Sequence, residues 1–209
     1  MGPIVGVDIG QKRDPTAICV AREDKRIEQD VGEVTHYLVH LLERLPLGTP
    51  YPRVVDRVAE VVHRASERTG QTVHVYVDAT GVGQPVVDLL QERSVEATPV
   101  YFTYGDRRTE EGDKVTLGKS FLVSRLQTLL QTRRIHLPNT SEARVLADEL
   151  QNYEIRVDEN ANDRYGAFRV GTHDDLVTAL GLAVQPTKQK RSPLWGTRNR
   201  PRRARRYRC

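Results

Sequence analysis

Two short apolar runs that carry an aspartate are the feature of this sequence that most constrains its fold. The run 3–10, PIVGVDIG, contains Asp8, and the run 72–77, TVHVYV, is followed at once by Asp78. Both runs are rich in β-branched residues, which favour strands. A carboxylate in or beside a buried strand is costly unless it is paired or binds a cation. We therefore expect two strands whose aspartates have a specific role.

Segments with helical spacing alternate with further strand-like runs. Strands are expected over 3–10, 15–22, 72–77, 95–102 and 134–138, and helices over 53–70, 85–93, 117–134, 141–153 and 173–184. Gly70 is a candidate C-cap and Ser141 a candidate N-cap. This order predicts an α/β fold in which helices flank a mixed central sheet.

Three segments are less regular. The run 34–45 fits a strand or a helix equally well, because its apolar positions follow neither period clearly. The segment 103–114 is polar and is interpreted as a loop. The segment 153–171 predicts an additional β-hairpin with a polar tip.

The charge of the chain is unevenly distributed. Its 209 residues suit one domain, and no apolar run reaches the roughly 18 residues of a membrane helix. Only two cysteines are present, which favours a reducing, intracellular setting over a secreted one. Residues 188–209 contain ten Lys or Arg and no acid, so 22 basic and 28 acidic residues remain in 1–187, a net charge of −6. We expect a domain over 1–187 and a flexible basic tail over 188–209.

Nucleotide binding is not favoured by the glycine-containing motifs. The segment 112–120, GDKVTLGKS, has five residues between Gly112 and Gly118 where a P-loop has four, and no strand is expected to lead into it. GVGQPV after Asp78 lacks the third glycine of a dinucleotide fingerprint and has Pro85 where a backbone N–H is needed. VGVDIG is similar to the phosphate-binding hairpin of actin-like folds, which have a second domain and usually a longer chain.

A third acidic position begins the last apolar helix, in the sequence THDDLVTAL. Asp174 and Asp175 would converge with Asp8 and Asp78 if strand ends and helix start share one edge of the sheet. Carboxylates gathered there repel one another unless a divalent cation neutralises them, and oxygen ligands suit Mg²⁺ or Mn²⁺. Two such cations roughly 3.5–4 Å apart form a phosphodiester-cleaving centre. Each acid also has a plainer interpretation as a turn or helix-capping residue.

These motifs together resemble the nuclease domain of the large terminase subunit of tailed phages, within the RNase H-like superfamily. The matching pieces are VGVDIGQKRDPTAICV, VYVDATGVGQPVVDLL, LGKSFLVSRLQTLLQTRRIHLP and GTHDDLVTALGLAV, in the family's order over most of residues 4–185.

The resemblance implies metal-dependent cutting of double-stranded DNA with little sequence preference during viral genome packaging in the host cytoplasm. By motif, Asp8, Asp78 and Asp174 would be catalytic, with Asp175 as a further metal ligand and Mg²⁺ or Mn²⁺ as cofactor. Lys119 matches a lysine of the family and could contact DNA or lie near the metals, or be a solvated helix lysine. His173, beside the aspartate pair, is a second possible auxiliary residue that could orient a ligand or water, or be a surface histidine at a helix start. The implied partners are DNA, the terminase ATPase domain, the small terminase and the portal, with no membrane. No P-loop ATPase domain is recognised in this sequence, so the chain alone is not expected to translocate DNA.

Two features extend this expectation. The hairpin over 153–171 lies where the family has a mobile β-hairpin near its active site. The basic tail would add salt-sensitive phosphate contacts through Arg202, Arg203, Arg205 and Arg206.

Two alternative functions stay open on the sequence. An RNase H-like resolvase or hybrid nuclease would use the same acids on junctions or RNA–DNA hybrids. A non-catalytic nucleic-acid-binding module would rely on the tail, although an acidic body repels phosphate in the absence of cations.

Overall fold

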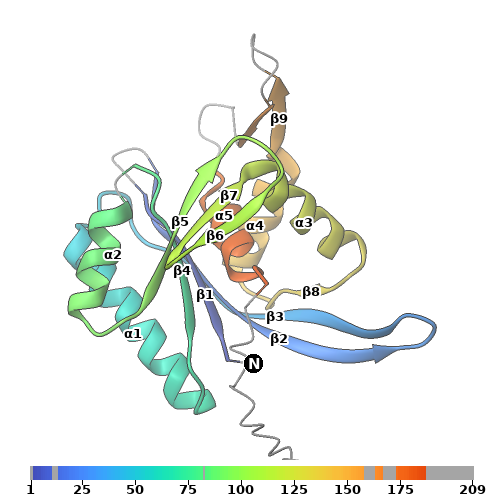
Figure 1. Cartoon of the computed structure of the whole chain (residues 1–209), viewed down its shortest axis with the longest axis horizontal. Helices are drawn as coiled ribbons and strands as arrows, with labels where there is room; N and C mark the ends of the chain where they lie inside the picture. Colours follow the sequence, from blue (N-terminus) through green and yellow to red (C-terminus); the bar gives the residue numbers. More distant parts are fainter. Residues whose placement is uncertain (1, 11–13, 82, 158–162, 167–172, 187–209) are drawn as a thin grey trace, which may run out of the picture.

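An eight-stranded mixed sheet forms the centre of the molecule (Figure 1). The computed structural model describes residues 2–10, 14–81, 83–157, 163–166 and 173–186. The strand order is β6-β7-β5-β4-β1-β2-β3-β8. Its strands are β1 (Ile4–Asp8), β2 (Ala17–Glu28), β3 (Gly32–Arg44), β4 (His74–Asp78), β5 (Ala97–Thr103), β6 (Arg108–Glu111), β7 (Lys114–Gly118) and β8 (Ile135–His136).

Strand direction places several carboxyl ends at one edge of the sheet. β1, β4, β5 and β7 are neighbours running parallel to one another. β2 returns antiparallel to β1, and β3 returns antiparallel to β2. The mixed sheet with flanking helices confirms the predicted fold class.

Helices cover both faces of this sheet (Figure 1). α1 (Tyr51–Thr69) and α2 (Gly83–Glu92) contribute to a core with one face, and α3 (Lys119–Gln131), α4 (Ser141–Asn152) and α5 (Asp175–Ala183) to a core with the other. α1 ends at Gly70, whose φ of 62° is left-handed, so this residue is the C-cap that the sequence predicted.

Four sequence-based expectations need correction or refinement. The ambiguous run 34–45 lies almost wholly in strand β3, since it pairs with β2 along its length. The segment 103–114 is not simply a loop, because it includes β6, which pairs with β7. β7 leads directly into α3, although no strand was expected at this place. The segment 112–120 still lacks the residue spacing of a P-loop. The N-cap of α4 is Thr140, whose hydroxyl accepts from the Ala143 N–H, rather than Ser141.

The predicted hairpin over 153–171 is confirmed by β9 (Glu154–Val157) and β10 (Asp163–Gly166), which pair antiparallel in a second sheet. Its tip lies outside the described residues, as do the tail 188–209 and its four candidate DNA-binding arginines. Across the described parts of the chain, we find no helix with the length and apolar character needed to span a membrane.

Candidate metal centre

Asp8 and Asp78 end two neighbouring parallel strands, β1 and β4. Alternation along each strand decides which face their side chains share. Ile4 and Tyr76 pack into the core beside α3, α4 and α5, whereas Val7 packs into the core beside α1 and α2. Asp8 and Asp78, each an even number of residues beyond Ile4 and Tyr76, therefore lie on the α5 side of the sheet.

Helix α5 lies directly against β1 at Gly6. A Cβ at this position would lie 2.2 Å from the carbonyl oxygen of Ala179 and 2.6 Å from the amide nitrogen of Ala183. Only glycine permits this approach without moving the helix. The glycine between two strand valines thus lets the acidic start of α5 come close to Asp8.

Electrostatics show that the predicted acids gather in one place. Burial raises the pKa of Asp8 well above its usual range, and the charges of Asp78, Asp174 and Asp175 raise it further. Lys119 is the nearby cation that opposes this shift. The structure therefore brings together the four aspartates and the lysine that the sequence selected.

The loop after Asp78 is tightly folded. Burial raises the pKa of this carboxyl, although Oδ1 accepts a hydrogen bond of 2.8 Å from the Thr80 N–H. A Cβ on Gly83 would lie 1.8 Å from the Asp78 carbonyl oxygen, so α2 begins immediately against the end of β4. Gly81 has a φ of 75°. The two glycines thus make the compact turn that holds Asp78 at the sheet edge.

The two consecutive aspartates have different surroundings. Asp174 is the N-cap residue of α5, but its side chain makes no capping hydrogen bond. Asp175 is buried, and its Oδ2 accepts a 2.6 Å hydrogen bond from Arg44 Nε. Neither side chain therefore acts as the ordinary N-cap that the plainer interpretation required.

His173 and Lys119 lie at the margins of this group. His173 Nδ1 is 3.8 Å from Asp14 Oδ1 and 3.9 Å from Asp175 Oδ1, beyond hydrogen-bond distance. Lys119 is the exposed first residue of α3, with Nζ 5.7 Å from the centre of the Phe102 ring.

The site also depends on two residues that sequence reasoning missed. Arg44, at the end of β3, contacts both Asp175 and Glu149 of α4. Glu149 is 6% exposed and follows Leu146 by three residues, on the buried face of α4. A charge at an apolar helix position was the available signal for Glu149, whereas nothing local marked Arg44.

The donor chemistry fits a hard divalent cation. In the described ranges, no three His, Cys, Asp or Glu side chains already stand in an arrangement that could hold a metal ion. The acids lie near one another but not close enough to form a ready-made metal site, as expected of carboxylates that repel one another. Asp175 Oδ1 is nevertheless buried and has no hydrogen-bond partner among the residues that the structure describes, and Asp8 lies near three other carboxylates. Both observations fit a cation held by carboxylate oxygens.

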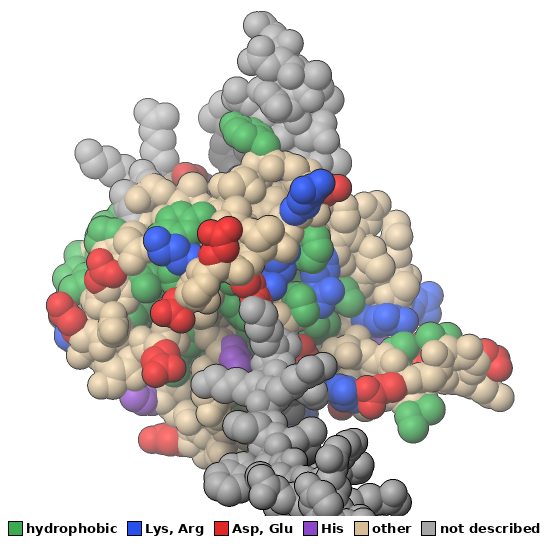
Figure 2. Space-filling view, viewed as in Figure 1, with side chains coloured by type: hydrophobic (Ala, Val, Ile, Leu, Met, Phe, Trp, Pro, Cys, Tyr) green, Lys and Arg blue, Asp and Glu red, His purple; other side chains and the backbone are tan. Residues whose placement is uncertain are grey.

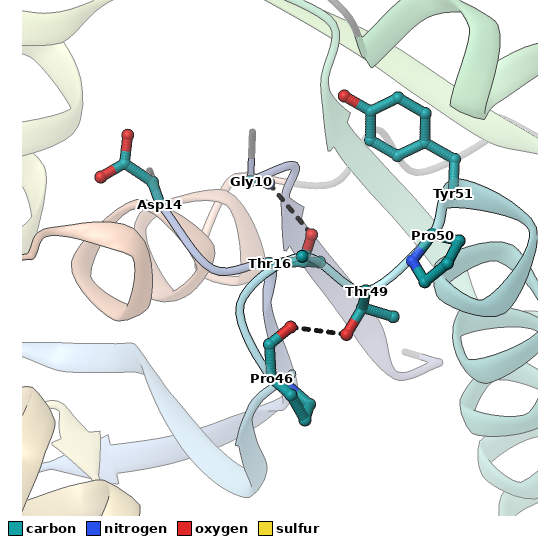
Figure 3. Close-up of a pocket in the computed structure, with 8 residues that line it drawn as sticks. Gly10, Asp14, Thr16, Pro46, Thr49, Pro50 and Tyr51 are labelled. Atoms are coloured by element: carbon teal, nitrogen blue, oxygen red, sulfur yellow. Dashed lines mark hydrogen bonds between the residues drawn. The ribbon is translucent and has the colours of Figure 1, made fainter. Parts of the chain in front are cut away.

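A small pocket of about 210 Å³ lies between the loop after β1 and the start of α1 (Figure 3). Its lining includes Gly10, Asp14 and Thr16 on one side and Thr49 and Tyr51 on the other. The Thr16 hydroxyl accepts a 3.0 Å hydrogen bond from the Gly10 N–H, which ties the loop to the base of β2. Asp14, which lines this pocket, has its Oδ1 3.8 Å from His173 Nδ1. The pocket therefore lies next to the group of aspartates.

Solved structures of terminase nucleases have the same fold as this chain. The large terminase nuclease from thermophilic phage G20c is 24% identical, with a TM-score of 0.60 over 87% of this chain and 80% of that chain. Its magnesium-bound structure is 25% identical, with a TM-score of 0.58 over 87% and 79%. The manganese-soaked human cytomegalovirus terminase nuclease domain is 12% identical, with a TM-score of 0.51 over 87% and 81%.

No curated protein matches the chain. The family model of the terminase RNase H-like domain matches residues 5–186, which extend from the second residue of β1 to beyond the end of α5. The chain therefore belongs to the terminase RNase H-like domain family.

Proposed function

We propose that this protein is a metal-dependent endonuclease that cuts double-stranded DNA with little sequence preference during viral genome packaging. The observation that carries the proposal is the gathering of Asp8, Asp78, Asp174 and Asp175 at one edge of the sheet. Family membership and the magnesium bound to a similar terminase nuclease support it.

The four aspartates would hold two Mg²⁺ or Mn²⁺ ions, with Asp8, Asp78 and Asp174 as the catalytic set. Bound in this way, the ions supply an activated water and charge stabilisation for the departing oxygen of a phosphodiester. The chain's own contribution is to fix the carboxylates on rigid strand and helix ends, since preorganised charge costs no rearrangement during the reaction.

Two further residues would act on the substrate side of the site. Lys119 is exposed, and its charge opposes the rise in the pKa of both Asp8 and Asp78. It can therefore contact a DNA phosphate while facing the carboxylates. His173 Nδ1 lies 3.9 Å from Asp175 Oδ1 and has no hydrogen-bond partner in the described part of the chain, so it can orient a water or a phosphate oxygen.

The setting follows from the same proposal. The chain would work in the host cytoplasm with the terminase ATPase domain, the small terminase and the portal. The arginines of the tail 188–209 would add phosphate contacts whose strength falls with salt.

Plasmid cleavage tests the function directly. Wild type, Asp78→Ala and Asp56→Ala are compared with Mn²⁺, Mg²⁺ or EDTA. Asp56 is a matched control because it is an exposed carboxylate of α1, paired at 3.1 Å with Arg93. We expect metal-dependent nicking and linearisation by wild type and by Asp56→Ala, and none by Asp78→Ala.

The other outcomes separate the alternatives. Salt-sensitive DNA retention without cleavage in any metal would favour a binding module. Faster cleavage of four-way junctions or RNA–DNA hybrids than of duplex would favour a resolvase or hybrid nuclease. Cleavage that survives Asp78→Ala would place the reaction elsewhere.

A further inference from the structure

Arg44 shares a row of the sheet with Asp8. Asp8 pairs with Ala17 of β2, and Ala17 pairs with Arg44 of β3. Residues in one row of a sheet direct their side chains to the same face. Leu42, two residues before Arg44, packs in the core on the α5 side. Arg44 is thus placed at the start of α5, on the same side as the acids.

One guanidinium joins two buried carboxylates there. Arg44 Nε donates to Asp175 Oδ2 at 2.6 Å, and Nη2 donates to Glu149 Oε1. The side chains of Asp175 and Glu149 are 3% and 5% exposed. Arginine suits this task because its planar fork reaches two acceptors at once, which an ammonium group cannot match.

Glu149 also completes the start of α5. Its second oxygen, Oε2, accepts a 3.2 Å hydrogen bond from the Val177 N–H in the first turn. Helix starts leave such N–H groups without intrahelical partners, and the N-cap side chain usually accepts from them. Here Asp174 makes no capping bond, and a glutamate from another helix satisfies the backbone. The N-cap carboxylate is therefore not committed to capping.

The arrangement leaves one oxygen of Asp175 unsatisfied. Oδ2 is held by Arg44, whereas Oδ1 is buried and has no hydrogen-bond partner among the described residues. The charge of Asp175 raises the pKa of Asp8, so this carboxylate lies near the acid group. A purely structural ion pair would gain by satisfying both oxygens, because an unpaired buried acceptor is destabilising.

We propose that Arg44 and Glu149 are positioning residues that fix Asp175 with Oδ1 presented to a divalent cation. This inference rests on the proposed nuclease function. Arg44 sets the rotation of the Asp175 carboxylate, and Glu149 fixes both the guanidinium and the first turn of α5. Metal affinity, and not only stability, therefore depends on residues that need not touch the metal.

The test measures Mn²⁺ binding by electron paramagnetic resonance and cleavage across Mn²⁺ concentrations. In Arg44→Gln, we expect the Mn²⁺ dissociation constant to rise at least about tenfold, as losses of outer-shell partners commonly cause. Cleavage at saturating Mn²⁺ should fall less. Arg44→Lys keeps the charge without the fork and should recover part of the affinity.

Arg57→Gln is the matched control. Arg57 also bridges two glutamates, Glu43 and Glu60, but on the α1 side of the molecule. This variant should lose stability and keep the wild-type Mn²⁺ affinity. Glu149→Gln, which retains an acceptor for the Val177 N–H, should weaken Mn²⁺ binding and provides the test if Arg44→Gln does not fold.

Three results would overturn the inference. Unchanged or tighter Mn²⁺ binding by folded Arg44→Gln would make Arg44 a structural or competing cation. An equal loss in Arg57→Gln would mean that affinity simply follows stability. Wild type that binds no Mn²⁺ and cuts no DNA would instead refute the proposed function, and the inference with it.

Discussion

Two arginine networks on opposite faces of the sheet differ in how well their charges balance. Arg57 donates to both oxygens of Glu43 and to Glu60, and Arg64 also pairs with Glu60 at 2.6 Å. Two arginines therefore meet two glutamates. On the other face, Arg44 alone meets Glu149 and Asp175, close to three more aspartates. Lys119 offsets only part of that excess.

On the proposed function, this difference separates a purely structural network from one that we expect to support metal binding. A balanced ion network needs no further partner, whereas unneutralised, partly buried carboxylates persist only where function maintains them. On the proposed function, we expect the acid group to destabilise the metal-free protein and to become favourable when a cation binds. Because Arg57, Arg64, Glu43 and Glu60 are already paired with one another, changing Arg57 should affect stability alone.

The largest expected effect is that of Asp8→Asn on cleavage. We expect a loss on the order of 1,000-fold, since several kcal/mol of metal-dependent stabilisation disappears with a ligand. The same change should raise the melting temperature in EDTA, because it removes a buried charge placed near three like charges. Nuclease assays and thermal melts check both parts. A lower melting temperature would show that repulsion in the acid group is not significant.

Gly6→Ala should disturb the face that carries the acid group, through the position of α5. The added Cβ would overlap backbone atoms of Ala179 and Ala183, so the helix must move away from β1. We expect the free energy of unfolding to fall by about 1–3 kcal/mol, as for overpacked cores, and cleavage to fall with it. Urea denaturation measures the first effect. Wild-type stability would mean that α5 adjusts without cost.

Arg57→Gln should affect the balanced network only. Removing the arginine leaves Glu43 without its partner, and we expect a loss of about 1 kcal/mol and a melting temperature lower by roughly 2–4 °C. Cleavage and its metal dependence should stay at wild-type values. A loss of cleavage as large as the loss of stability would contradict the distinction between the Arg57 and Arg44 networks.

The smallest effect concerns pH on the α1 side. A groove of about 400 Å³ is lined there by His40, Arg22, Arg64 and Arg68, among others. Burial first, and then the charge of Arg22, lowers the pKa of His40 below 6.5. The folded protein therefore holds a proton on His40 less readily than the unfolded chain. The stability that this histidine contributes is present above pH 6.5 and is lost as the pH falls through that value towards the folded pKa.

His40→Gln should therefore lose less stability than wild type between pH 7 and pH 5. Thermal melts of both proteins at matched ionic strength measure this difference. Parallel pH profiles for the two proteins would refute the assigned cause.

Local pattern was sufficient for many elements and for the candidate acids. β-branched runs followed by turn residues predicted β1, β2 and β4, and helical spacing predicted α1, α3 and α5. Local sequence pattern was not sufficient where the pairing of strands determines the structure. The run 34–45 has an ambiguous period because β3 is stabilised by a long antiparallel partner. The short strand β6 is polar because it lies at the sheet's edge, and it pairs with β7, whose Val115 and Leu117 are buried.

The sequence by itself determined the sheet-and-helix alternation, the family and the choice of Asp8, Asp78, Asp174 and Asp175, because these depend on periodicity and short motifs. Only the tertiary structure decided that Arg44, 131 positions before Asp175, holds that carboxylate, and that Glu149 completes the start of α5. Such contacts join distant strands and helices. Their energy depends on burial and distance in three dimensions, which no local spacing in the chain encodes.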